Sequence, residues 1–262
     1  MQSIRLNHRK IGGRKLYEML QPFMEEHSIK IGRDALFSIL AANHLLIKRR
    51  KRKIQTTNSL HWLRKYPNLI RDFIPTAINE LWVSDITYWK LGEKHSYISF
   101  ITDAHSHKIV GYNVADTLEA VESISSLQMA FSALGAEKPL QLVHHSDRGV
   151  QYCSSKYVEL LQQYDVKISM TENGDPLENA IAERLNGIMK QEYLETYHIN
   201  NLADAKVLLN KVVDLYNNER PHMSIGNLTP NQIHKSNNNI KPEKLWKNYY
   251  QKNLTIVNQL QD

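Results

Sequence analysis

The sequence predicts an α/β fold: a mixed five-stranded sheet flanked by helices, preceded by a small all-α domain that resembles a helix-turn-helix. Between residues 80 and 114, three strand-like runs rich in β-branched and aromatic residues follow one another with short turns between them. Helical and strand-like segments then alternate to residue 170. Three antiparallel strands followed by alternating helices and strands give a mixed sheet, in the order of a ribonuclease-H-like domain.

The all-α domain is predicted from two apolar patterns with helical spacing. The first begins at the glycine pair 12–13 and runs to about His27, and the second extends from Arg33 to Asn43. Two short helices joined by a tight turn resemble a helix-turn-helix, whose second helix can lie in a major groove of DNA. A plain helical hairpin, packed on the main domain or on a partner, explains the pattern alone equally well. The apolar positions are Leu16, Met19, Leu20 and Phe23, then Leu36, Ile39 and Leu40.

Positive charge is concentrated in the same part of the chain. Residues 1–53 hold 13 of the 33 Lys and Arg residues but only 4 of the 27 Asp and Glu residues. Six cations in succession repel one another unless they are solvated or neutralised by a polyanion. A solvated linker is the simpler interpretation, but the neighbouring helical pair favours contact with DNA phosphates. The run consists of Lys48, Arg49, Arg50, Lys51, Arg52 and Lys53.

Composition divides the chain into four parts. Residues 1–53 form the basic helical domain, 54–79 a linker, 80–235 the main domain with its C-terminal helices, and 236–262 a tail. We expect a cytoplasmic protein, because no apolar run is long enough to span a bilayer and the first residues lack the apolar part of a secretory signal. The single cysteine, Cys153, cannot form an internal disulfide and is interpreted as a bystander.

The elements of the main domain follow from alternation and turn residues. Strands are expected over residues 80–91, 95–102 and 108–114, and Thr117 is expected to cap a helix that ends at Gly135. A strand over 140–145, a helix over 154–164, a strand over 166–170, a helix over 202–218 and a helix from Thr229-Pro230 onward complete the domain. Candidates for burial on the first of these helices are Leu118, Val121, Ile124, Leu127, Met129 and Phe131.

The helix that carries Glu183 has the clearest start. Asp175, Pro176 and Glu178 fit the N-cap, N1 and N3 positions of a capping box. At about 100° and 1.5 Å per residue, Glu183 and Lys190 lie nearly in line and roughly 10 Å apart along the axis. Their polar face, with Asn179 and Asn186, lies opposite an apolar face made by Ile181, Leu185 and Ile188.

Three carboxylates are candidates for the chemistry. Asp85 lies inside a strand of apolar and β-branched residues, where an aspartate is disfavoured and costly unless compensated. Asp147 follows the 140–145 strand. The sequence Ser-Asp-Arg-Gly is also typical of a turn, which would explain this aspartate without a catalytic role. Glu183 taken alone fits an exposed helical glutamate. If the three converge, a divalent metal ion is the natural compensation, and their oxygen ligands suit Mg²⁺.

Other polar residues have simpler explanations. Asp103 lies before a hairpin turn, which favours a local hydrogen-bonding role. Because Mg²⁺ prefers oxygen ligands, nearby histidines are interpreted as structural residues or substrate contacts. No Gly-x-x-x-x-Gly-Lys loop occurs, so no ATP site is expected. The histidines are His105, His107, His144 and His145.

The three acidic motifs together resemble the DDE signature of integrase-core transposases. They read Trp-Val-Ser-Asp85-Ile-Thr-Tyr, His-Ser-Asp147-Arg-Gly-Val-Gln-Tyr and Asn179-Ala-Ile-Ala-Glu183, with 35 residues between the second and third acids. They are most similar to the second-reading-frame product of bacterial insertion sequences of the IS-three group, which are relatives of retroviral integrases.

Two further positions match the same family and two depart from it. Lys190 occupies its basic position seven residues after the glutamate, and residues 216–222 resemble its Tyr-Asn-x-x-Arg-Pro-His ending. Glu178-Asn179 stands where relatives commonly have Asp-Asn, and Cys153 replaces a more usual Thr or Ser. Neither departure touches the three acids.

The resemblance implies metal-dependent cleavage and strand transfer of DNA for the movement of an insertion sequence. Asp85, Asp147 and Glu183 would hold two Mg²⁺ ions, for which Mn²⁺ can substitute. Lys190 would position phosphate, and Arg220 or His222 would support the site or contact DNA, although a helix stop explains Arg-Pro-His equally well. The implied partners are DNA of the element ends and target, further copies of the chain, and an upstream-frame protein or fusion.

Two other functions fit the same features. A non-catalytic DNA-binding regulator would have no reason to gather acids where DNA lies, so the acidic triad argues against it. A plain ribonuclease-H-like nuclease would cut DNA without joining ends. The basic arm and the position of Lys190 favour transposition over this second alternative.

Overall fold

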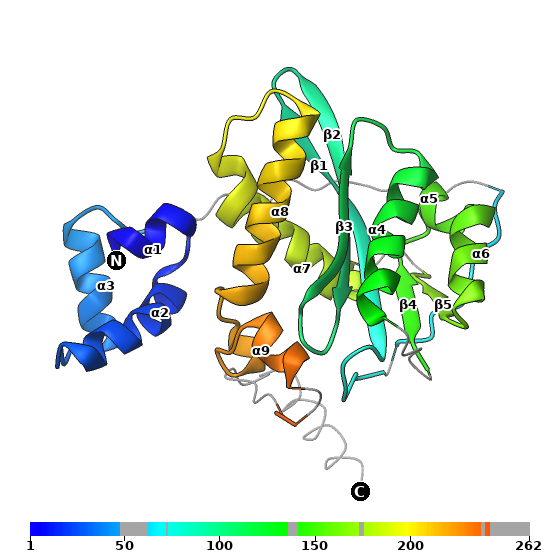
Figure 1. Cartoon of the computed structure of the whole chain (residues 1–262). Helices are drawn as coiled ribbons and strands as arrows, with labels where there is room; N and C mark the ends of the chain where they lie inside the picture. The colour runs from blue at the N-terminus through cyan, green and yellow to red at the C-terminus, as the bar shows by residue number, and fades with distance from the viewer. Residues whose placement is uncertain (48–61, 72, 136–140, 173–175, 237–238, 242–262) are drawn as a thin grey trace, which may run out of the picture.

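The computed structural model describes residues 1–47, 62–71, 73–135, 141–172, 176–236 and 239–241 (Figure 1). Its first helices are α1 (Gln2–Asn7), α2 (Gly13–Glu26) and α3 (Arg33–Ala42). The last two match the predicted pair, whereas α1 was not predicted. Their apolar side chains pack on one another around Leu16, Leu20 and Leu40.

The main domain is built on a five-stranded sheet in the order β3-β2-β1-β4-β5. The pairs β1–β2 and β2–β3 are antiparallel, whereas β1–β4 and β4–β5 are parallel. This arrangement confirms the predicted mixed sheet. The strands are β1 (Leu81–Leu91), β2 (Lys94–Asp103), β3 (Ile109–Ala115), β4 (Val143–Ser146) and β5 (Lys167–Met170).

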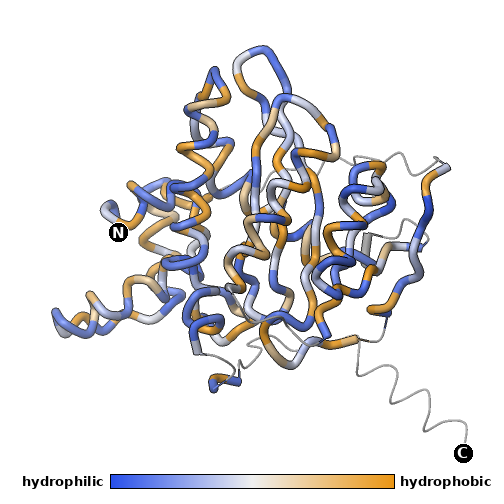
Figure 2. The backbone as a smooth tube through the Cα atoms, turned by 45° about the vertical axis from the view of Figure 1, so that its right-hand side comes forward, coloured by the Kyte–Doolittle hydropathy of each residue, from blue (hydrophilic) through white to orange (hydrophobic). Residues whose placement is uncertain are grey.

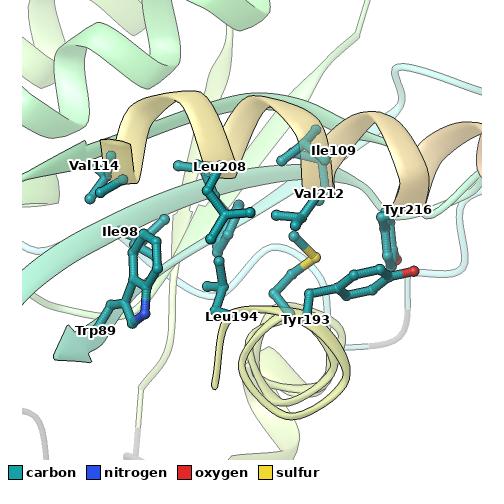
Figure 3. Close-up of a cluster of buried hydrophobic side chains, with 14 of the residues drawn as sticks. Trp89, Ile98, Ile109, Val114, Tyr193, Leu194, Leu208, Val212 and Tyr216 are labelled. Atoms are coloured by element: carbon teal, nitrogen blue, oxygen red, sulfur yellow. The ribbon is translucent and has the colours of Figure 1, made fainter. Parts of the chain in front are cut away.

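Helices cover both faces of the sheet, because successive strand residues point to opposite sides. On β2, Ile98 and Phe100 pack toward α7 (Ala180–Ile188) and α8 (Leu202–Asn218), as Figure 3 shows for Ile98. Ile101 instead packs toward the opposite layer. That layer consists of α4 (Ala120–Leu134), α5 (Val150–Cys153) and α6 (Ser155–Gln163), visible on the other side of the sheet in Figure 1.

Helix α4 corrects two sequence predictions. Its N-cap is Glu119 rather than Thr117. Three of the residues predicted to be buried, Leu118, Val121 and Met129, are exposed. The buried face instead includes small residues, because α4 lies so close to β3 that a Cβ on Gly111 would stand only 2.1 Å from the Ser126 carbonyl oxygen. The buried residues of α4 are Ser123, Ser126, Leu127, Ala130 and Phe131.

The start of α7 also differs from the prediction. Residues Pro176–Asn179 form a 3₁₀ turn, and the N-cap of α7 is Asn179, which makes no side-chain capping bond. Glu178 accepts a hydrogen bond from the Glu172 backbone N–H at 2.7 Å, so it is used outside the helix rather than in a capping box. The predicted N-cap, Asp175, lies outside the described residues.

The end of α7 is irregular. The helix continues into a π-helical turn, Met189–Tyr193, and then into a 3₁₀ turn, Leu194–Thr196. Met189, Tyr193 and Leu194 are buried under α8 in the cluster drawn in Figure 3. Lys190 is therefore carried by the π-helical turn and not by a regular continuation of the Glu183 helix.

The C-terminal helices begin where the sequence predicted. The Asn201 side chain caps α8 by accepting from the Asp204 N–H, and α8 ends shortly before Pro221. Thr229 and Gln232 form a capping box at the start of α9 (Pro230–Lys235).

Hydrophobic and hydrophilic residues interchange along the helices (Figure 2). In the described part of the chain, none of the helices combines the length and apolar character needed to span a membrane.

The described end of the predicted linker runs along the edge strand β5. Pro67 O accepts from the Met170 N–H at 3.2 Å, and the Leu69 N–H donates to Ser169 Oγ at 2.8 Å. Arg71 forms an ion pair with Glu172 at 2.7 Å. Covering an edge strand in this way removes unpaired backbone groups that would otherwise invite pairing with another chain.

Candidate active site

Asp85 lies in the middle of the central strand β1 and faces the α7 layer. Trp82 packs on the α4 side of the sheet and Trp89 on the α7 and α8 side, so the alternation along β1 places Asp85 with Trp89. Asp85 Oδ1 accepts from the Ile86 N–H at 2.9 Å, and Oδ2 accepts from Asn186 Nδ2 at 2.8 Å. Helix α7 thus contacts the strand directly at this carboxylate.

The three predicted acids are close enough to act on one another electrostatically. Burial and, to a smaller extent, the negative charges of Asp147 and Glu183 together raise the pKa of Asp85 to about 7, against two hydrogen bonds that lower it. Like charges near one another disfavour ionisation, so this site stores electrostatic repulsion that a cation would relieve.

Asp147 follows β4, the parallel neighbour of β1. One of its oxygens, Oδ1, accepts from the Gly149 N–H at 3.0 Å, which confirms the turn chemistry seen in the sequence. A Cβ on Gly149 would lie 3.0 Å from the same oxygen, so glycine lets the loop fold tightly around the carboxylate.

Glu183 is in the first turn of α7, between two asparagines that attach the helix to β1. Asn179 Nδ2 donates to the Ser84 carbonyl at 2.9 Å, and Asn186 Nδ2 donates to Asp85. The amide oxygens of both asparagines are buried and make no hydrogen bond. Glu183 itself is half-buried on this face.

The donor set suits a hard divalent cation. It consists of carboxylate oxygens, with the unpartnered Asn186 Oδ1 beside them. Within the described ranges, however, no three His, Cys, Asp or Glu side chains form a group that could hold a metal ion as it stands. The fit to Mg²⁺ is therefore one of chemistry and charge, and the side chains would have to turn toward one another to surround an ion.

Lys190 lies near enough to Asp85 for the two charges to interact. It is half-buried on the π-helical turn. Burial lowers its pKa, whereas the charges of Glu195 and Asp85 raise it. Of the three candidate acids, Asp85 is thus the one whose charge acts on Lys190.

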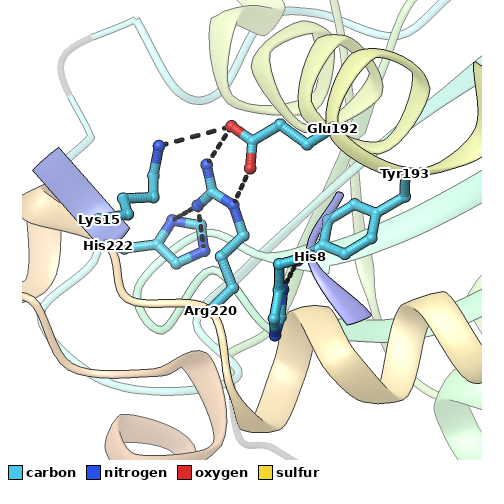
Figure 4. A network of polar contacts seen from close by, with 6 residues as sticks. All are labelled: His8, Lys15, Glu192, Tyr193, Arg220 and His222. Carbon is cyan, nitrogen blue, oxygen red and sulfur yellow. Dashed lines mark hydrogen bonds and ion pairs between the residues drawn. The ribbon is translucent and has the colours of Figure 1, made fainter. Parts of the chain in front are cut away.

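The structure places Arg220 and His222, which were predicted to support the site or contact DNA, inside the protein. Arg220 is 1% exposed and forms two hydrogen bonds to the Glu192 carboxylate, at 2.8 and 2.9 Å (Figure 4). Its Nη1 lies 2.9 Å from His222 Nε2, and the His222 ring stacks on His107. Arg220 thus ties the end of α8 to the π-helical turn, and His222 packs against Arg220 and His107.

The remaining candidates have structural roles. Asp103 accepts from the Ser106 N–H and Oγ and from the Asn79 N–H, which confirms its local role. His144 Nε2 is 2.7 Å from Ser84 Oγ, and burial lowers the pKa of His144 to about 3. Cys153 is buried with its Sγ 3.7 Å from Met170 Sδ.

Sequence reasoning missed His8, Lys15 and Glu192. Lys15 contacts Glu192 and His8 contacts Tyr193, and each pair joins segments more than 170 positions apart. No local pattern in the sequence indicates these contacts. The run Lys48, Arg49, Arg50, Lys51, Arg52 and Lys53, predicted to bind DNA, lies outside the described residues.

The sheet order, the acid on its central strand and the helix that carries a second acid define the class of integrase-core proteins. Two family models agree: both are described as integrase core domains, and they match residues 75–176 and 164–230. In fold, the chain is similar to a chain of the simian T-cell lymphotropic virus intasome in complex with PP2A regulatory subunit B56 gamma. The TM-score is 0.55 and the identity 19%, over 90% of this chain and 79% of that one.

Comparison with curated proteins identifies the family within the integrase-core class. An uncharacterized 31 kDa protein of insertion element IS600 from Shigella sonnei is 35% identical over 80% of this chain and 78% of its own length. The transposase for insertion sequence element IS629 from Shigella sonnei is 30% identical over 88% of this chain and 75% of its own length. The chain belongs to the integrase-core transposases of bacterial insertion sequences.

Proposed function

We propose that this protein moves an insertion sequence by metal-dependent DNA cleavage and strand transfer, in which a 3′-hydroxyl attacks a phosphodiester. The observation that carries the proposal is the electrostatic coupling of Asp85 with Asp147 and Glu183 on the face of β1 that α7 covers. Buried acids that repel one another cost stability. A cation-dependent reaction requires such a group of acids, whereas a DNA-binding regulator does not.

The three acids would hold divalent ions of the Mg²⁺ type, with Mn²⁺ as a substitute. Bound there, such ions would supply Lewis acidity for the attacking and leaving oxygens of the phosphodiester. Asn186 orients the Asp85 carboxylate by donating to Oδ2, which leaves Oδ1 toward Ile86. Lys190 would hold a phosphate next to the acids.

DNA is the proposed partner. The basic run at 48–53 follows the helical pair that resembles a helix-turn-helix, and both suit a polyanion. We also propose that several copies of the chain act together on two element ends and a target. An upstream-frame protein or fusion would assist in recognising the ends.

Strand transfer of a labelled, pre-cut element end into plasmid DNA tests the proposal. We expect joining by the wild-type chain with Mg²⁺ or Mn²⁺, loss of joining with a chelator, and loss of joining in Glu183→Gln. Glu159→Gln, at an exposed position of α6, is the matched control and should join normally.

Each alternative predicts a different result in the same assay. A nuclease would cut the DNA without joining ends, and a regulator would bind DNA without either reaction. Equal joining by wild type and Glu183→Gln would refute the assignment of Glu183. If the wild-type chain fails to join, the fused form with its upstream frame is assayed, and failure of that form refutes the transposase proposal.

A further inference from the structure

The π-helical turn Met189–Tyr193 determines where Lys190 lies. It continues α7 directly, so its winding sets the direction of the Lys190 side chain relative to Glu183. Such turns are rare because their hydrogen bonding is less favourable than that of an α-helix. A π-helical turn at this position therefore needs contacts that hold it in place.

The side chain of Glu192 supplies one set of these contacts. Arg220 donates two hydrogen bonds to its carboxylate, and Lys15 of α2 lies 3.4 Å from Oε1 (Figure 4). The side chains of Lys15 and Glu192 are 19% and 17% exposed, so water screens the pair only partly. The turn is thus held by a cation from the C-terminal motif and another from the N-terminal helices.

A second set of contacts comes from the segment between α1 and α2. His8, 1% exposed, lies 3.0 Å from Tyr193 OH through Nδ1 and 3.0 Å from Glu219 Oε2 through Nε2. Arg9 donates to the Thr196 carbonyl at 3.0 Å and lies over the Tyr197 ring. The segment therefore contacts the π-helical turn, the 3₁₀ turn after it and the end of α8.

These contacts go beyond what attachment of a DNA-binding arm requires. The apolar residues of α1–α3 pack among themselves, while the contacts named above are polar, and those of Lys15 and His8 reach the π-helical turn. An arm that only bound DNA could be tethered anywhere on the domain. Here its attachment includes the π-helical turn that carries Lys190, through Glu192 and Tyr193.

We propose that the N-terminal helices are a positioning element of the active site: through Glu192 and Tyr193, Lys15 and His8 fix the π-helical turn and so hold Lys190 in place for a DNA phosphate. Lys15, His8, Glu192 and Tyr193 are positioning residues, and only Lys190 would touch the substrate. The inference rests on the proposed strand-transfer function.

The first test compares Lys15→Met with Lys30→Met in the full chain. Both changes remove one positive charge from the N-terminal helices, but Lys30 is exposed and outside the contacts described above. At saturating DNA, we expect Lys15→Met to reduce the joining rate about tenfold, within the range that a misplaced group can cause. The DNA concentration for half-maximal rate should change little, and Lys15→Arg should restore the rate. A Lys15→Met rate equal to that of Lys30→Met would overturn the inference.

Hydrogen exchange tests the same contacts without an activity readout. In Lys15→Met, amides of residues 189–193 should exchange faster than in wild type and in Lys30→Met, while β1 and β2 keep their protection. Unchanged exchange at 189–193 would refute the positioning role. Faster exchange throughout the domain would also refute it, because it would indicate a general loss of stability.

A double variant separates positioning from a purely structural effect. If Lys15 acts through Lys190, then adding Lys15→Met to Lys190→Met should not slow joining further. Losses that multiply would overturn the inference while leaving the proposed function intact. Failure of wild type and of the fused form to join would instead refute the proposed function, together with the inference that rests on it.

Discussion

Two charged side chains inside the protein, Asp85 and Arg220, are compensated to different degrees. Arg220 meets a carboxylate that accepts two of its hydrogen bonds, and a third guanidinium contact goes to His222. Within the described ranges, Asp85 accepts hydrogen bonds from one amide and one backbone N–H, and it shares its surroundings with two further acids. The first arrangement stabilises the fold, whereas the second costs stability in the absence of a cation.

Asp85 should make the stability of the metal-free protein depend on pH. An unfolded aspartate titrates at about 3.9, whereas burial and the neighbouring acids raise the pKa of Asp85 to about 7. Between these values the folded protein binds more protons than the unfolded one, so the free energy of unfolding falls as pH rises. With a chelator present, Asp85→Asn should raise the free energy of unfolding at pH 8 by about 1 to 3 kcal/mol, and hardly at pH 4.

Urea denaturation of both proteins at the two pH values checks this expectation. Asp165→Asn, at an exposed position, is the control and should leave the pH profile unchanged. A wild-type protein that is as stable at pH 8 as at pH 4, relative to Asp85→Asn, would contradict the raised pKa. Added Mg²⁺ should stabilise the wild type more than Asp85→Asn.

Arg220→Ala should be among the most destabilising substitutions in the chain. It leaves the Glu192 carboxylate buried with only Lys15 as a cationic partner, and breaking a buried pair typically costs about 3 to 5 kcal/mol. Arg220→Lys should recover little of this loss, because an ammonium cannot donate the two parallel hydrogen bonds.

Urea denaturation again provides the measurement. The matched control is Arg71→Ala, which breaks a pair whose arginine is 63% exposed and should cost less than about 1 kcal/mol. Similar losses for Arg220→Ala and Arg71→Ala would show that the buried pair is not important for stability.

At the scale of elements, the strands were easier to predict than the helix faces. Runs of β-branched and aromatic residues identify β1 to β3 locally, and turn residues mark their ends. The face of α4 could not be read in this way, since Ser126 is buried by its contact with Gly111 and Val121 is left exposed. That contact is long-range, and no periodicity in the helix itself reports it.

The same limit explains the start of α7. Asp175, Pro176 and Glu178 fit a capping box by spacing, but Glu178 bonds to the Glu172 N–H across the preceding loop. Tertiary structure determines which of two possible hydrogen-bond partners such a residue uses. Local sequence spacing carries no information about that choice. The short α5 (Val150–Cys153) was missed for a similar reason, because four residues are too few for a helical pattern.

The close approach of α4 and β3 can be tested by one methyl group. Gly111→Ala would place a Cβ 2.1 Å from the Ser126 carbonyl, a backbone atom that cannot move aside without shifting the helix. We expect a loss of about 3 kcal/mol in the free energy of unfolding. Gly187→Ala is the control: it meets nothing within 4 Å, and removing a helical glycine should stabilise by about 0.5 to 1 kcal/mol. Thermal and urea denaturation measure the free energy of unfolding of both variants. Equal effects of the two changes would contradict the close packing of α4 on β3.

At the scale of the whole molecule, the parts of the candidate site differ in how far the sequence reveals them. Asp85 stands out because an acid is unusual inside a strand, and the spacing to Asp147 and Glu183 completes a family motif. The contact of Lys15 with Glu192 joins segments 177 positions apart, and neither residue is unusual in its local sequence. A residue that is unusual in its local sequence can be identified as a candidate from the sequence. A contact between charged residues far apart in the sequence is found only from the three-dimensional structure.

The uneven charge of the chain leads to a prediction about its binding to DNA. Residues 48–53 contribute six of the 13 cations in the first 53 residues. If all six contact phosphates, replacing them with serine should reduce the slope of log affinity against log salt by about 5, since each neutralised phosphate contributes about 0.9. Fluorescence anisotropy of a labelled duplex at several salt concentrations measures the slope. Lys206→Ser with Lys211→Ser, two exposed cations of α8, is the control and should leave it unchanged. An unaltered slope in the six-residue variant would favour the alternative that this run is a solvated linker, and DNA binding would then have to be assigned to other cations.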